Sequence, residues 1–405
     1  MQKINTAIHS SEVATSVVFS VHWGFLLLVM SPLGALFQLL VVMPFEILGI
    51  FWKNYKLAAF HNTRSDKHAT LAILITGCDT GFGHTLALEF LSASPPPPPS
   101  ANSCLYKSAS YVIYAGCYNQ AGCDALALEA SSVETLYGNM LVPIVMDVTS
   151  PSSSVSAIAK LIKFVDATPL AYLHSVINNA GIGTPGLVDI LSLDDEPERG
   201  KPSFKNDMDV NYYGMLRTVK NAMPLLKQQV SYSDKSLRYS NGAQVINITS
   251  MAGIVSSPCM SAYSSSKFAA EAMSTALRHE LKPWGISVCT VNPSFHKTPL
   301  VGGIGPSFER LWESGMTEEH QDQYGRKYFN ELKYMGTKQS QGAEWEACNV
   351  SDGIIRAVRD RFGGQLLIGL DAKLFISLMR HLPVWAQDYM VGFICPRLGP
   401  AMLGE

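Results

Sequence analysis

The sequence predicts an α/β fold, a doubly wound parallel sheet of seven strands with helices on both faces. From Leu71 onward, short apolar runs rich in β-branched residues alternate with helical patterns. This alternation is typical of a parallel sheet that is covered on both sides. The predicted strands cover residues 71–76, 111–116, 141–148, 173–180, 243–249, 286–292 and 365–370.

The composition fits one large domain with extensions. The chain has 405 residues, a net charge of -2 and 16% charged residues, with no basic or acidic block. We therefore expect no nucleic-acid partner, since nothing would attract one over a distance. Three parts are expected: a membrane anchor and linker at 1–65, one large α/β domain at 66–372 and an apolar extension at 373–405, which would line an entrance to that domain or contact a membrane.

The N-terminal part is a long apolar segment. From Ala14 to Trp52 the only charged residue is Glu46, and a membrane helix needs about 20 such residues. The segment is too long for a signal-peptide core and lacks arginine, so we expect a retained anchor. Pro32 and Gly34 divide it, and the sequence does not choose between a hairpin and one span with an interfacial helix. A buried core helix is the weaker alternative.

Positive residues flank the anchor unequally. Lys53, Lys56, Arg64 and Lys67 follow it, whereas Lys3 alone precedes it. The positive-inside rule then places the catalytic domain in the cytosol. We expect a protein of the endoplasmic reticulum membrane with its catalytic domain facing the cytosol.

A glycine-rich loop follows the first predicted strand. Gly77, Gly81 and Gly83 lie in "TGCDTGFG", just before a helix that is predicted to begin near His84. Glycines let the backbone turn tightly and approach a ligand, and the amides of a helix N-terminus bind anions. Because it closes a strand and opens a helix, this loop predicts a dinucleotide phosphate site.

Three polar stretches are expected to be surface insertions. The first, 92–103, contains five consecutive prolines, which favour polyproline II and exclude a strand or helix interior. A polyproline ligand for a partner domain is the sharper alternative. Residues 194–207 and 228–242 are predicted to be surface loops.

A second group of residues indicates acid-base chemistry. Ser250 follows an apolar strand, Tyr263 comes thirteen residues later, and Lys267 comes four after that in a helical pattern. Tyr263 and Lys267 then share one helix face. A neighbouring ammonium would lower the pKa of the phenol, so that Tyr263 could exchange a proton with a substrate hydroxyl or carbonyl.

These features together resemble the short-chain dehydrogenase/reductase family. The likeness covers about residues 71–370, and "NNAG" at 178–181, "VMDV" at 145–148 and "VNYYG" at 210–214 occur in the family's order. The resemblance implies a Rossmann-type fold, an NAD(P) cofactor and, through pairing of helices, a possible homodimer.

The resemblance also implies residue roles. Ser250 would orient the substrate oxygen, Tyr263 would be the acid-base, and Lys267 would bind the nicotinamide ribose and lower the tyrosine pKa. Asn211 would hold a water that leads from Lys267 to solvent, Asp147 would contact the adenine, and Asn178 would lie beside the ribose. The expected cofactor-binding residues are Gly77, Asp79, Thr80, Gly81, Phe82, Gly83, Asp147, Val148, Asn178, Tyr263, Lys267, Pro293 and Thr298.

One departure concerns the loop after the sixth strand. The family has Pro-Gly before a threonine, whereas this chain has Pro293-Ser294 before Thr298. Glycine there permits a close approach to the nicotinamide, so the serine puts that contact in question. "ITGCDTGFG", the stretch at 308–329 and "GLDAKLFISLMRHLP" are similar to the branch of retinol, hydroxysteroid and 3-hydroxybutyrate dehydrogenases.

Asp79 lies inside the glycine loop, where a carboxylate would repel a pyrophosphate. In NAD-preferring sites an acid at the end of the second strand accepts the ribose 2'-hydroxyl. Here that strand ends without an acid or an arginine, so Asp79 is a candidate for this role and NAD is the expected cofactor, with NADP not excluded. The equal alternative is that Asp79 only caps the turn.

We expect no metal site, because His84, His174 and His296 are isolated in the sequence and no paired ligand spacing occurs among the cysteines. The leading hypothesis is a membrane-anchored oxidoreductase that moves hydride between NAD(H) and a lipophilic alcohol such as a retinoid or hydroxysteroid. Two alternatives are a dehydrogenase of a polar hydroxy acid such as 3-hydroxybutyrate and a cofactor-binding scaffold without catalysis.

Overall fold

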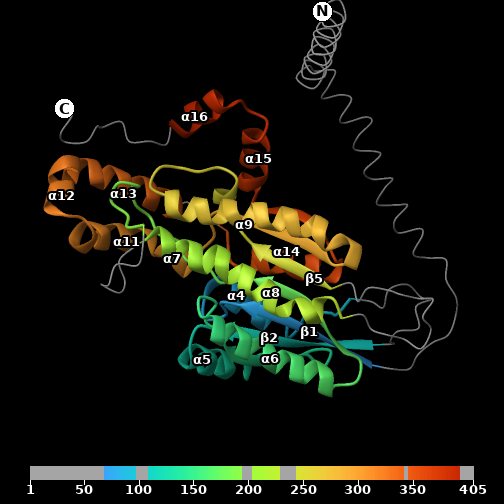
Figure 1. Cartoon of the computed structure of the whole chain (residues 1–405). Coiled ribbons are helices and arrows are strands. Elements are labelled where there is room, and N and C mark those ends of the chain that lie inside the picture. The colour runs from blue at the N-terminus through green and yellow to red at the C-terminus, as the bar shows by residue number, and fades with distance from the viewer. Residues whose placement is uncertain (1–67, 97–107, 194–202, 229–242, 342–344, 393–405) are drawn as a thin grey trace, which may run out of the picture. The chain divides into compact units, whose positions relative to one another are not determined.

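A parallel sheet of seven strands, in the order β3-β2-β1-β4-β5-β6-β7, forms the centre of the domain and confirms the predicted fold class (Figure 1). The computed structural model describes residues 68–96, 108–193, 203–228, 243–341 and 345–392. These residues belong to one compact unit. The strands are β1 (His68–Thr76), β2 (Ser108–Cys117), β3 (Met140–Val145), β4 (Ala171–Asn178), β5 (Gln244–Ile248), β6 (Ser287–Pro293) and β7 (Gly364–Ile368).

Helices cover both faces of the sheet. On β2, Tyr111 packs against Phe90, which directly follows α4, whereas Tyr114 packs against Phe164 of α6. Side chains an odd number of residues apart on a strand point to opposite faces, so α4 and α6 lie on opposite sides. One layer contains α6 (Pro151–Ala167), α8 (Met215–Leu226) and α9 (Ser261–Glu280), and the other α4 (Gly81–Glu89), α5 (Gln120–Ala130) and α14 (Cys348–Arg359).

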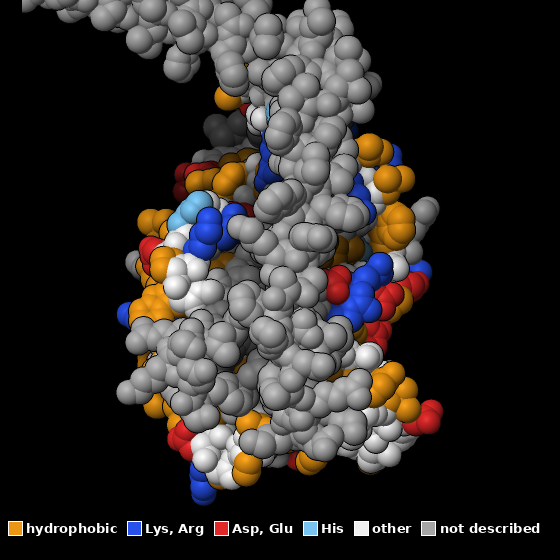
Figure 2. All heavy atoms as spheres, turned by 90° about the vertical axis from the view of Figure 1, so that its right-hand side faces the viewer, with side chains coloured by type: hydrophobic (Ala, Val, Ile, Leu, Met, Phe, Trp, Pro, Cys, Tyr) orange, Lys and Arg blue, Asp and Glu red, His pale blue; other side chains and the backbone are white. Residues whose placement is uncertain are grey.

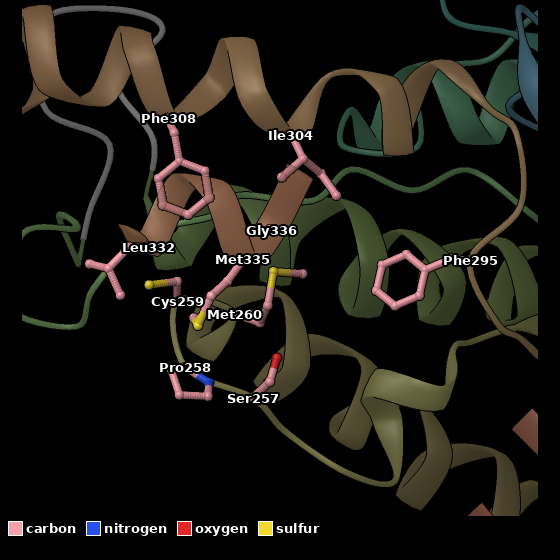
Figure 3. A pocket seen from close by; sticks show the side chains of 10 residues that line it. All are labelled: Ser257, Pro258, Cys259, Met260, Phe295, Ile304, Phe308, Leu332, Met335 and Gly336. Atoms are coloured by element: carbon pink, nitrogen blue, oxygen red, sulfur yellow. The ribbon is translucent and has the colours of Figure 1, made fainter. Parts of the chain in front are cut away.

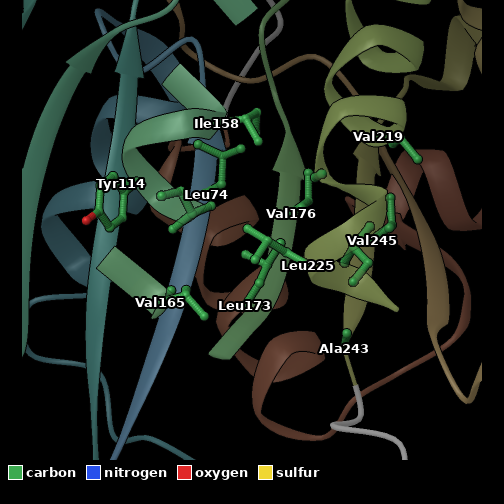
Figure 4. Packing of buried hydrophobic residues seen from close by; sticks show 14 of the residues in the cluster. Leu74, Tyr114, Ile158, Val165, Leu173, Val176, Val219, Leu225, Ala243 and Val245 are labelled. Carbon is green, nitrogen blue, oxygen red and sulfur yellow. The ribbon is translucent and has the colours of Figure 1, made fainter. Parts of the chain in front are cut away.

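One hydrophobic core cluster lies between the sheet and the layer of α6, α8 and α9. Figure 4 shows strand residues such as Leu74, Val176 and Val245 facing Ile158 of α6 and Val219 and Leu225 of α8. Strands buried on both faces must be apolar on every residue, which explains why β1 is an almost continuous apolar run.

The strand order reverses between β1 and β4, which are neighbours although β2 and β3 intervene in the sequence. In open α/β sheets a crevice forms at this switch point, outside the carboxyl ends of the strands. Thr76 and Asn178 end these two strands, so the residues that follow them line the crevice.

A small helical unit lies between β6 and α14. It contains α10 (Pro299–Gly302), α11 (Ile304–Arg310), η5 (Leu311–Gly315), α12 (Glu318–Tyr324) and α13 (Arg326–Gln341). Phe308, Leu311 and Phe329 form its own core with Ile190 and Leu191. In Figure 1 these helices (orange) gather at one end of the domain, and α15 (Leu370–Met379) and α16 (Val384–Gly392), in red, extend away from the sheet.

The structure corrects one predicted loop. Residues 194–207 are predicted to be a surface loop, but α7 (Phe204–Met208) is a helix and the Asp207 side chain is fully buried. The π-helix η2 (Asp209–Gly214) continues it into α8. Ser203 caps α7 by accepting the N–H of Asn206, so the segment is helical despite its polar composition.

The predicted anchor, Ala14–Trp52, and most of the two other insertions lie outside the described residues. Within the described part of the chain, none of the helices has the length and apolarity needed to cross a membrane.

Candidate active site

The glycine loop turns at two residues with left-handed backbone. Gly77 has φ of 69° and Gly81 has φ of 64°, which L side chains rarely adopt. Helix α4 begins at Gly81, somewhat earlier than predicted, and Thr80 precedes it in an extended conformation without a side-chain cap. The amides of the first helical turn are thus left for an anion, as a pyrophosphate site requires.

The turn after β4 fastens the glycine loop. Asn179 Nδ2 donates to the carbonyls of Thr76 and Gly77, both at 2.9 Å, and Thr76 Oγ1 accepts the amides of Asn179 and Ala180. A Cβ on Gly83 would lie only 2.3 Å from Asn179 Nδ2. The sequence prediction singled out Asn178, whereas its neighbour Asn179 makes these contacts.

Asn178 points into the sheet. Its Nδ2 donates to Asn247 Oδ1 on β5 at 2.7 Å, and Asn247 Nδ2 donates to Ser274 on α9. This buried chain ties the fourth and fifth strands to α9. The predicted place of Asn178 beside a ribose stays a prediction.

Ser250, Tyr263 and Lys267 come together at the carboxyl end of β5. Ser250 follows the strand and its Oγ accepts the amide of Ala252 in η3 (Met251–Gly253). Tyr263 and Lys267 lie on α9, with Lys267 Nζ 5.7 Å from the tyrosine ring centroid. Lys267 is buried, and its Nζ donates to the carbonyl of Ile248 at 3.1 Å. The predicted sharing of one helix face is confirmed.

Asn211 lies in the π-helix η2 and is fully buried. Its Oδ1 accepts the amide of Ile182, and its Nδ2 donates to the carbonyl of Ile182 and to Ser266 Oγ, each at 2.9 Å. A Cβ on Gly181 would lie 3.4 Å from Lys267 Nζ. Asn211 therefore holds the loop after β4 next to Lys267. Single-turn π segments of this kind are frequent at functional sites.

A cavity of about 620 Å³ opens beside these residues. Ser250 and Tyr263 line it, as do Phe82 of the glycine loop and Pro293 and Thr298 after β6. The apolar lining comes from several elements, including α15 and α16, and consists of Met251, Val255, Met260, Phe295, Leu300, Val301, Ile304, Leu374, Phe375, Leu378 and Val391. Among the described lining residues there is no lysine or arginine.

Comparison with known proteins places this site in a family. Residues 108–307 match the family of short chain dehydrogenases. The mouse mitochondrial D-beta-hydroxybutyrate dehydrogenase (Mus musculus) is 29% identical over 276 residues, which are 66% of this chain and 68% of that protein. The human short-chain dehydrogenase/reductase family 9C member 7 is 27% identical over 354 residues, 86% of this chain and 96% of that protein. Rat retinol dehydrogenase 16 (Rattus norvegicus) is 26% identical over 332 residues, 80% and 89% of the two chains.

The chain is a short-chain dehydrogenase/reductase. It belongs to the branch of these relatives and is an NAD(P)-dependent oxidoreductase. Its fold is similar to that of a short chain dehydrogenase/reductase from Burkholderia phymatum in complex with NAD, with a TM-score of 0.54 and 19% identity, covering 79% of this chain and 95% of that one.

Ser294, the departure from the family pattern, is accommodated by a neighbouring glycine. A Cβ on Gly369 would lie 2.4 Å from Ser294 Oγ, and Gly369 itself has φ of 103°. The Ser294 amide donates to the carbonyl of Ile368 at 3.1 Å. The serine therefore lies beneath the end of β7, and this short-chain dehydrogenase keeps Pro293 and Thr298 at the cavity wall.

Asp79 reaches the end of the second strand. Both carboxylate oxygens accept the amide of Tyr118, at 3.0 and 2.9 Å, and Tyr118 directly follows β2. This contact joins the glycine loop to the end of β2, and capping of the loop's own turn by Asp79 stays a prediction. The carboxylate also lies where NAD-preferring sites place an acid, and its lone pairs exceed what one amide uses.

Asp147 and Val148 lie just after the carboxyl end of β3. Asp147 Oδ1 accepts the amide and the hydroxyl of Thr149, at 2.9 and 2.7 Å. Val148 is buried against Gly214, and its carbonyl accepts a bond from Arg217. The predicted adenine contact of Asp147 stays a prediction.

The pKa of Tyr263 is raised and not lowered, and the predicted lowering effect of Lys267 stays a prediction. Burial raises the pKa of Tyr263 to about 12, a hydrogen bond with Ser250 lowers it, and the charge of Asp207 raises it. Burial lowers the pKa of Lys267 to about 8, against the charges of Asp207 and Glu271. Desolvation disfavours the charged form of either group and is the largest cause of both shifts. Tyr263 is consequently held as a proton donor at neutral pH.

A second layer beneath Ser250 was missed by sequence reasoning. Glu271 Oε1 accepts bonds from Thr249 Oγ1 and Asn292 Nδ2, and Asn292 Nδ2 also donates to the carbonyl of Ser250 at 3.0 Å. Glu271 comes four residues after Lys267 on α9, and this helical spacing is the one sequence signal that could have placed it near the site. The network fixes the backbone that carries Ser250.

A narrow pocket of about 20 Å³ extends the apolar side of the cavity. It shares Ser257, Met260, Phe295 and Ile304 with the main cavity. Figure 3 shows the sulfurs of Met260, Met335 and Cys259 near its centre, with Phe308 and Leu332 at its edge. Methionine side chains adapt readily in shape, so this wall can fit more than one apolar group.

The isolated histidines have structural contacts. His84 pairs with Glu129 at 3.1 Å, His174 is buried beside Ser175 with a pKa lowered to about 3 by burial, and His296 Nδ1 bonds the carbonyl of Ser294. Within the described ranges, no group of histidine, cysteine and acidic residues could hold a metal ion.

Helices α15 and α16 carry large apolar side chains in solvent. Trp385 is 73% exposed, and Leu374 and Leu378 are exposed while also lining the cavity. On the face drawn in Figure 2, by contrast, side chains of both charge signs are interspersed with apolar ones over the described surface. Exposed apolar groups at a cavity entrance are typical of a site for ligand or membrane contact.

Proposed function

We propose that the protein is a membrane-associated oxidoreductase that transfers hydride between NAD(H) and a lipophilic alcohol or carbonyl, such as a retinoid or a hydroxysteroid. The observation that carries the proposal is the large, mainly apolar cavity, whose lining includes Ser250 and Tyr263. Pockets of this kind select apolar ligands and use a few polar groups for orientation.

The backbone of the glycine loop forms a cradle for the cofactor, and side chains at its glycine positions would fill it. A Cβ on Gly77 would lie 2.7 Å from Ala180 Cα, so the loop backbone is free of side chains where a pyrophosphate would approach the amides of α4. Asp79 would accept a ribose hydroxyl, and Lys267, Pro293 and Thr298 would bind the nicotinamide end. The bound nicotinamide accepts or supplies the hydride.

The protein residues then handle the proton. In reduction, Ser250 and Tyr263 hold the carbonyl oxygen, and the Tyr263 hydroxyl gives its proton to that oxygen as the carbon gains hydride. In oxidation the alcohol proton passes to the Tyr263 phenolate as the carbon loses hydride. Burial raises the pKa of Tyr263, so the protonated phenol is the form present at neutral pH and reduction can start from it. Oxidation needs the phenolate, so its rate should rise with pH. Lys267 and a water held near Asn211 would return the proton to solvent.

NAD is the proposed preferred cofactor. Asp79 lies at the end of β2, where its carboxylate would accept a 2'-hydroxyl and repel a 2'-phosphate. Dual use with equal kinetics would argue against this role.

The membrane is the proposed source of substrate. The exposed apolar residues of α15 and α16 adjoin the cavity, and the sequence of Ala14–Trp52 is long and apolar enough to anchor the chain. We propose an endoplasmic reticulum location with the catalytic domain in the cytosol. A homodimer is proposed from the family resemblance alone.

The polar-substrate alternative lacks an anchor. A hydroxy-acid carboxylate calls for a cationic partner, and the described lining of the cavity contains no lysine or arginine. A non-catalytic scaffold would have no need for Ser250 and Tyr263 at the cavity beside the buried Lys267 and Asn211.

The test is an initial-rate panel in detergent or liposomes. The full-length protein is assayed with NAD and NADP separately against retinol, several hydroxysteroids and 3-hydroxybutyrate. We expect turnover of a lipophilic alcohol with NAD preferred. Turnover of 3-hydroxybutyrate alone, or silence across the panel while NAD binds, would contradict the proposal.

A further inference from the structure

Asp207 is a buried acid that the mechanism above leaves without a role. It is 0% exposed, and both of its carboxylate oxygens are bonded to one residue: Oδ1 accepts the Thr184 hydroxyl at 2.6 Å and Oδ2 accepts the Thr184 amide at 3.1 Å. A buried carboxylate is costly unless it is paired, so an apolar residue of similar size would be the ordinary choice for a merely structural position.

Asp207 holds the loop that forms one wall of the cavity. It is four residues before Asn211 on the continuous α7–η2 segment, so the two side chains lie on one face. Asn211 binds Ile182 and Asp207 binds Thr184, so together they clamp residues 182–184. Gly183, inside the clamp, lines the cavity, and a Cβ there would lie 3.4 Å from the Tyr263 ring.

The charges around Asp207 are few. Helix α7 packs against η2 and α9. From α9, Lys267 lowers the pKa of Asp207, and Tyr263 is the other titratable group that it affects. On its own segment, Lys205 and Asp209 pair with each other at 2.6 Å, and Asp209 also pairs with Arg217. The loop residues 182–186 contain no titratable side chain. Lys267 is thus the buried cation that Asp207 can stabilise.

We propose that Asp207 is a positioning residue of the active site, which keeps Lys267 in its ammonium form and fixes the loop beside Tyr263. The proposal rests on the acid-base role of Tyr263 and Lys267 given above. Burial raises the pKa of Asp207 to about 6, and the hydrogen bonds from Thr184 oppose this rise. The carboxylate is therefore charged at pH 7 and protonated below about pH 6.

The sign of its effect follows from its charge. A negative charge raises the pKa of a nearby ammonium and of a nearby phenol, since it favours the protonated form of both. Removing the charge should lower both pKa values. The pH profile of alcohol oxidation, which depends on both groups as a coupled pair, should then move to lower pH.

The test compares Asp207→Asn with the full-length wild type and with Asp209→Asn. The Asn variant keeps the size and one acceptor but removes the charge, and Asp209→Asn removes a carboxylate from the same segment that pairs with Lys205 and Arg217 instead. The readout is kcat/KM for NAD-dependent oxidation of a lipophilic alcohol between about pH 5.5 and 10. We expect the Asp207→Asn profile to move by about 1 unit toward acid. Below about pH 6 the difference should vanish, because Asp207 is then neutral in the wild type.

The outcomes separate an effect of the Asp207 charge from a purely structural one. A loss by one common factor at all pH values would assign Asp207 a purely structural role and overturn the proposal, as would an equal displacement in Asp209→Asn. If Asp207→Asn does not fold, Asp207→Ser removes the same charge without crowding and should give the same displacement. Tyr263→Phe is run in parallel: if it retains activity, the proposed function itself fails, whereas an inactive Tyr263→Phe with an unmoved Asp207→Asn profile overturns this inference alone.

Discussion

At the scale of single residues, burial sets the properties of the site more than neighbouring charges do. Tyr263 and Lys267 are four residues apart on α9, as their spacing predicts. Desolvation nevertheless raises the pKa of Tyr263 and lowers the pKa of Lys267, which favours the neutral form of each. Asp79 is held by the Tyr118 amide at the end of β2. Its proposed contact with a ribose hydroxyl would give the same carboxylate a binding role beside this structural one.

The Asp79 assignment predicts a change in cofactor preference. In Asp79→Asn the amide oxygen can still accept the Tyr118 amide, but the negative charge is gone. We expect the KM for NAD to rise about 10-fold, the loss of one charge-assisted hydrogen bond, with the KM for NADP unchanged or lower. Steady-state kinetics with both cofactors measure this, and Asp124→Asn, an exposed carboxylate on α5 bonded to Gln120, is the control. Equal losses with NAD and NADP would show that Asp79 acts only on the turn.

At the scale of elements, tight backbone approaches join the glycine loop to the turn after β4. Both Gly77 and Gly83 lie against residues 179 and 180, and Asn179 bonds two carbonyls of the loop. The cofactor cradle thus depends on two strand ends that are far apart in sequence but adjacent at the switch point.

A side chain added where the glycine loop meets the turn after β4 should weaken cofactor binding. Gly83→Ala places a Cβ 2.3 Å from Asn179 Nδ2 and from the Gly77 carbonyl, which cannot move without distorting the loop. We expect the Kd for NAD to rise at least about 10-fold, since overpacking of this kind costs about 1–3 kcal/mol. Fluorescence titration measures it. Gly302→Ala, where a Cβ meets nothing within 4 Å, is the matched control and should bind NAD normally. Unchanged affinity in a folded Gly83→Ala would refute the cradle.

The elements that sequence patterns predicted are those set by local or periodic signals. The strands near the centre of the sheet are rich in buried apolar residues, and Tyr263 and Lys267 follow helical spacing. The Asp207 segment was assigned to the surface because its composition is polar. Its burial depends on Thr184, a contact across 23 residues that no local pattern contains. The same holds for Asn179 and for Glu271 with Asn292, whose partners are brought together only by the sheet.

At the scale of the whole molecule, the cavity connects the catalytic residues with an exposed apolar surface. Leu374 and Leu378 line the cavity and are also 65% and 49% exposed, so α15 lies at its entrance. The sequence analysis expected an apolar C-terminal extension at 373–405 that would line a substrate entrance or contact a membrane, and Leu374 and Leu378 of this extension line the cavity.

If this surface contacts a membrane, kcat/KM should depend on whether the substrate is delivered from lipid or from water. Trp385→Ser removes an exposed apolar anchor of α16, and burial of such a side chain in lipid contributes about 1.5–3 kcal/mol. We expect kcat/KM for a vesicle-borne lipophilic alcohol to fall about 10-fold, with no change for a short water-soluble alcohol. Leu128→Ser, which removes an apolar side chain 76% exposed on α5, should leave both rates unchanged. Equal losses for both substrates would contradict membrane delivery.

The most direct measurement is the rate of NAD-dependent oxidation of a lipophilic alcohol by Tyr263→Phe, with the Kd for NAD measured in the same preparation. Phenylalanine keeps the ring between Lys267 and the cavity but has no proton to exchange. We expect kcat to fall by about 10²–10⁴-fold, the usual contribution of a general acid-base, while NAD binds as in the wild type. Turnover that is unchanged in Tyr263→Phe would contradict the proposed mechanism, because the proton would then pass through another group.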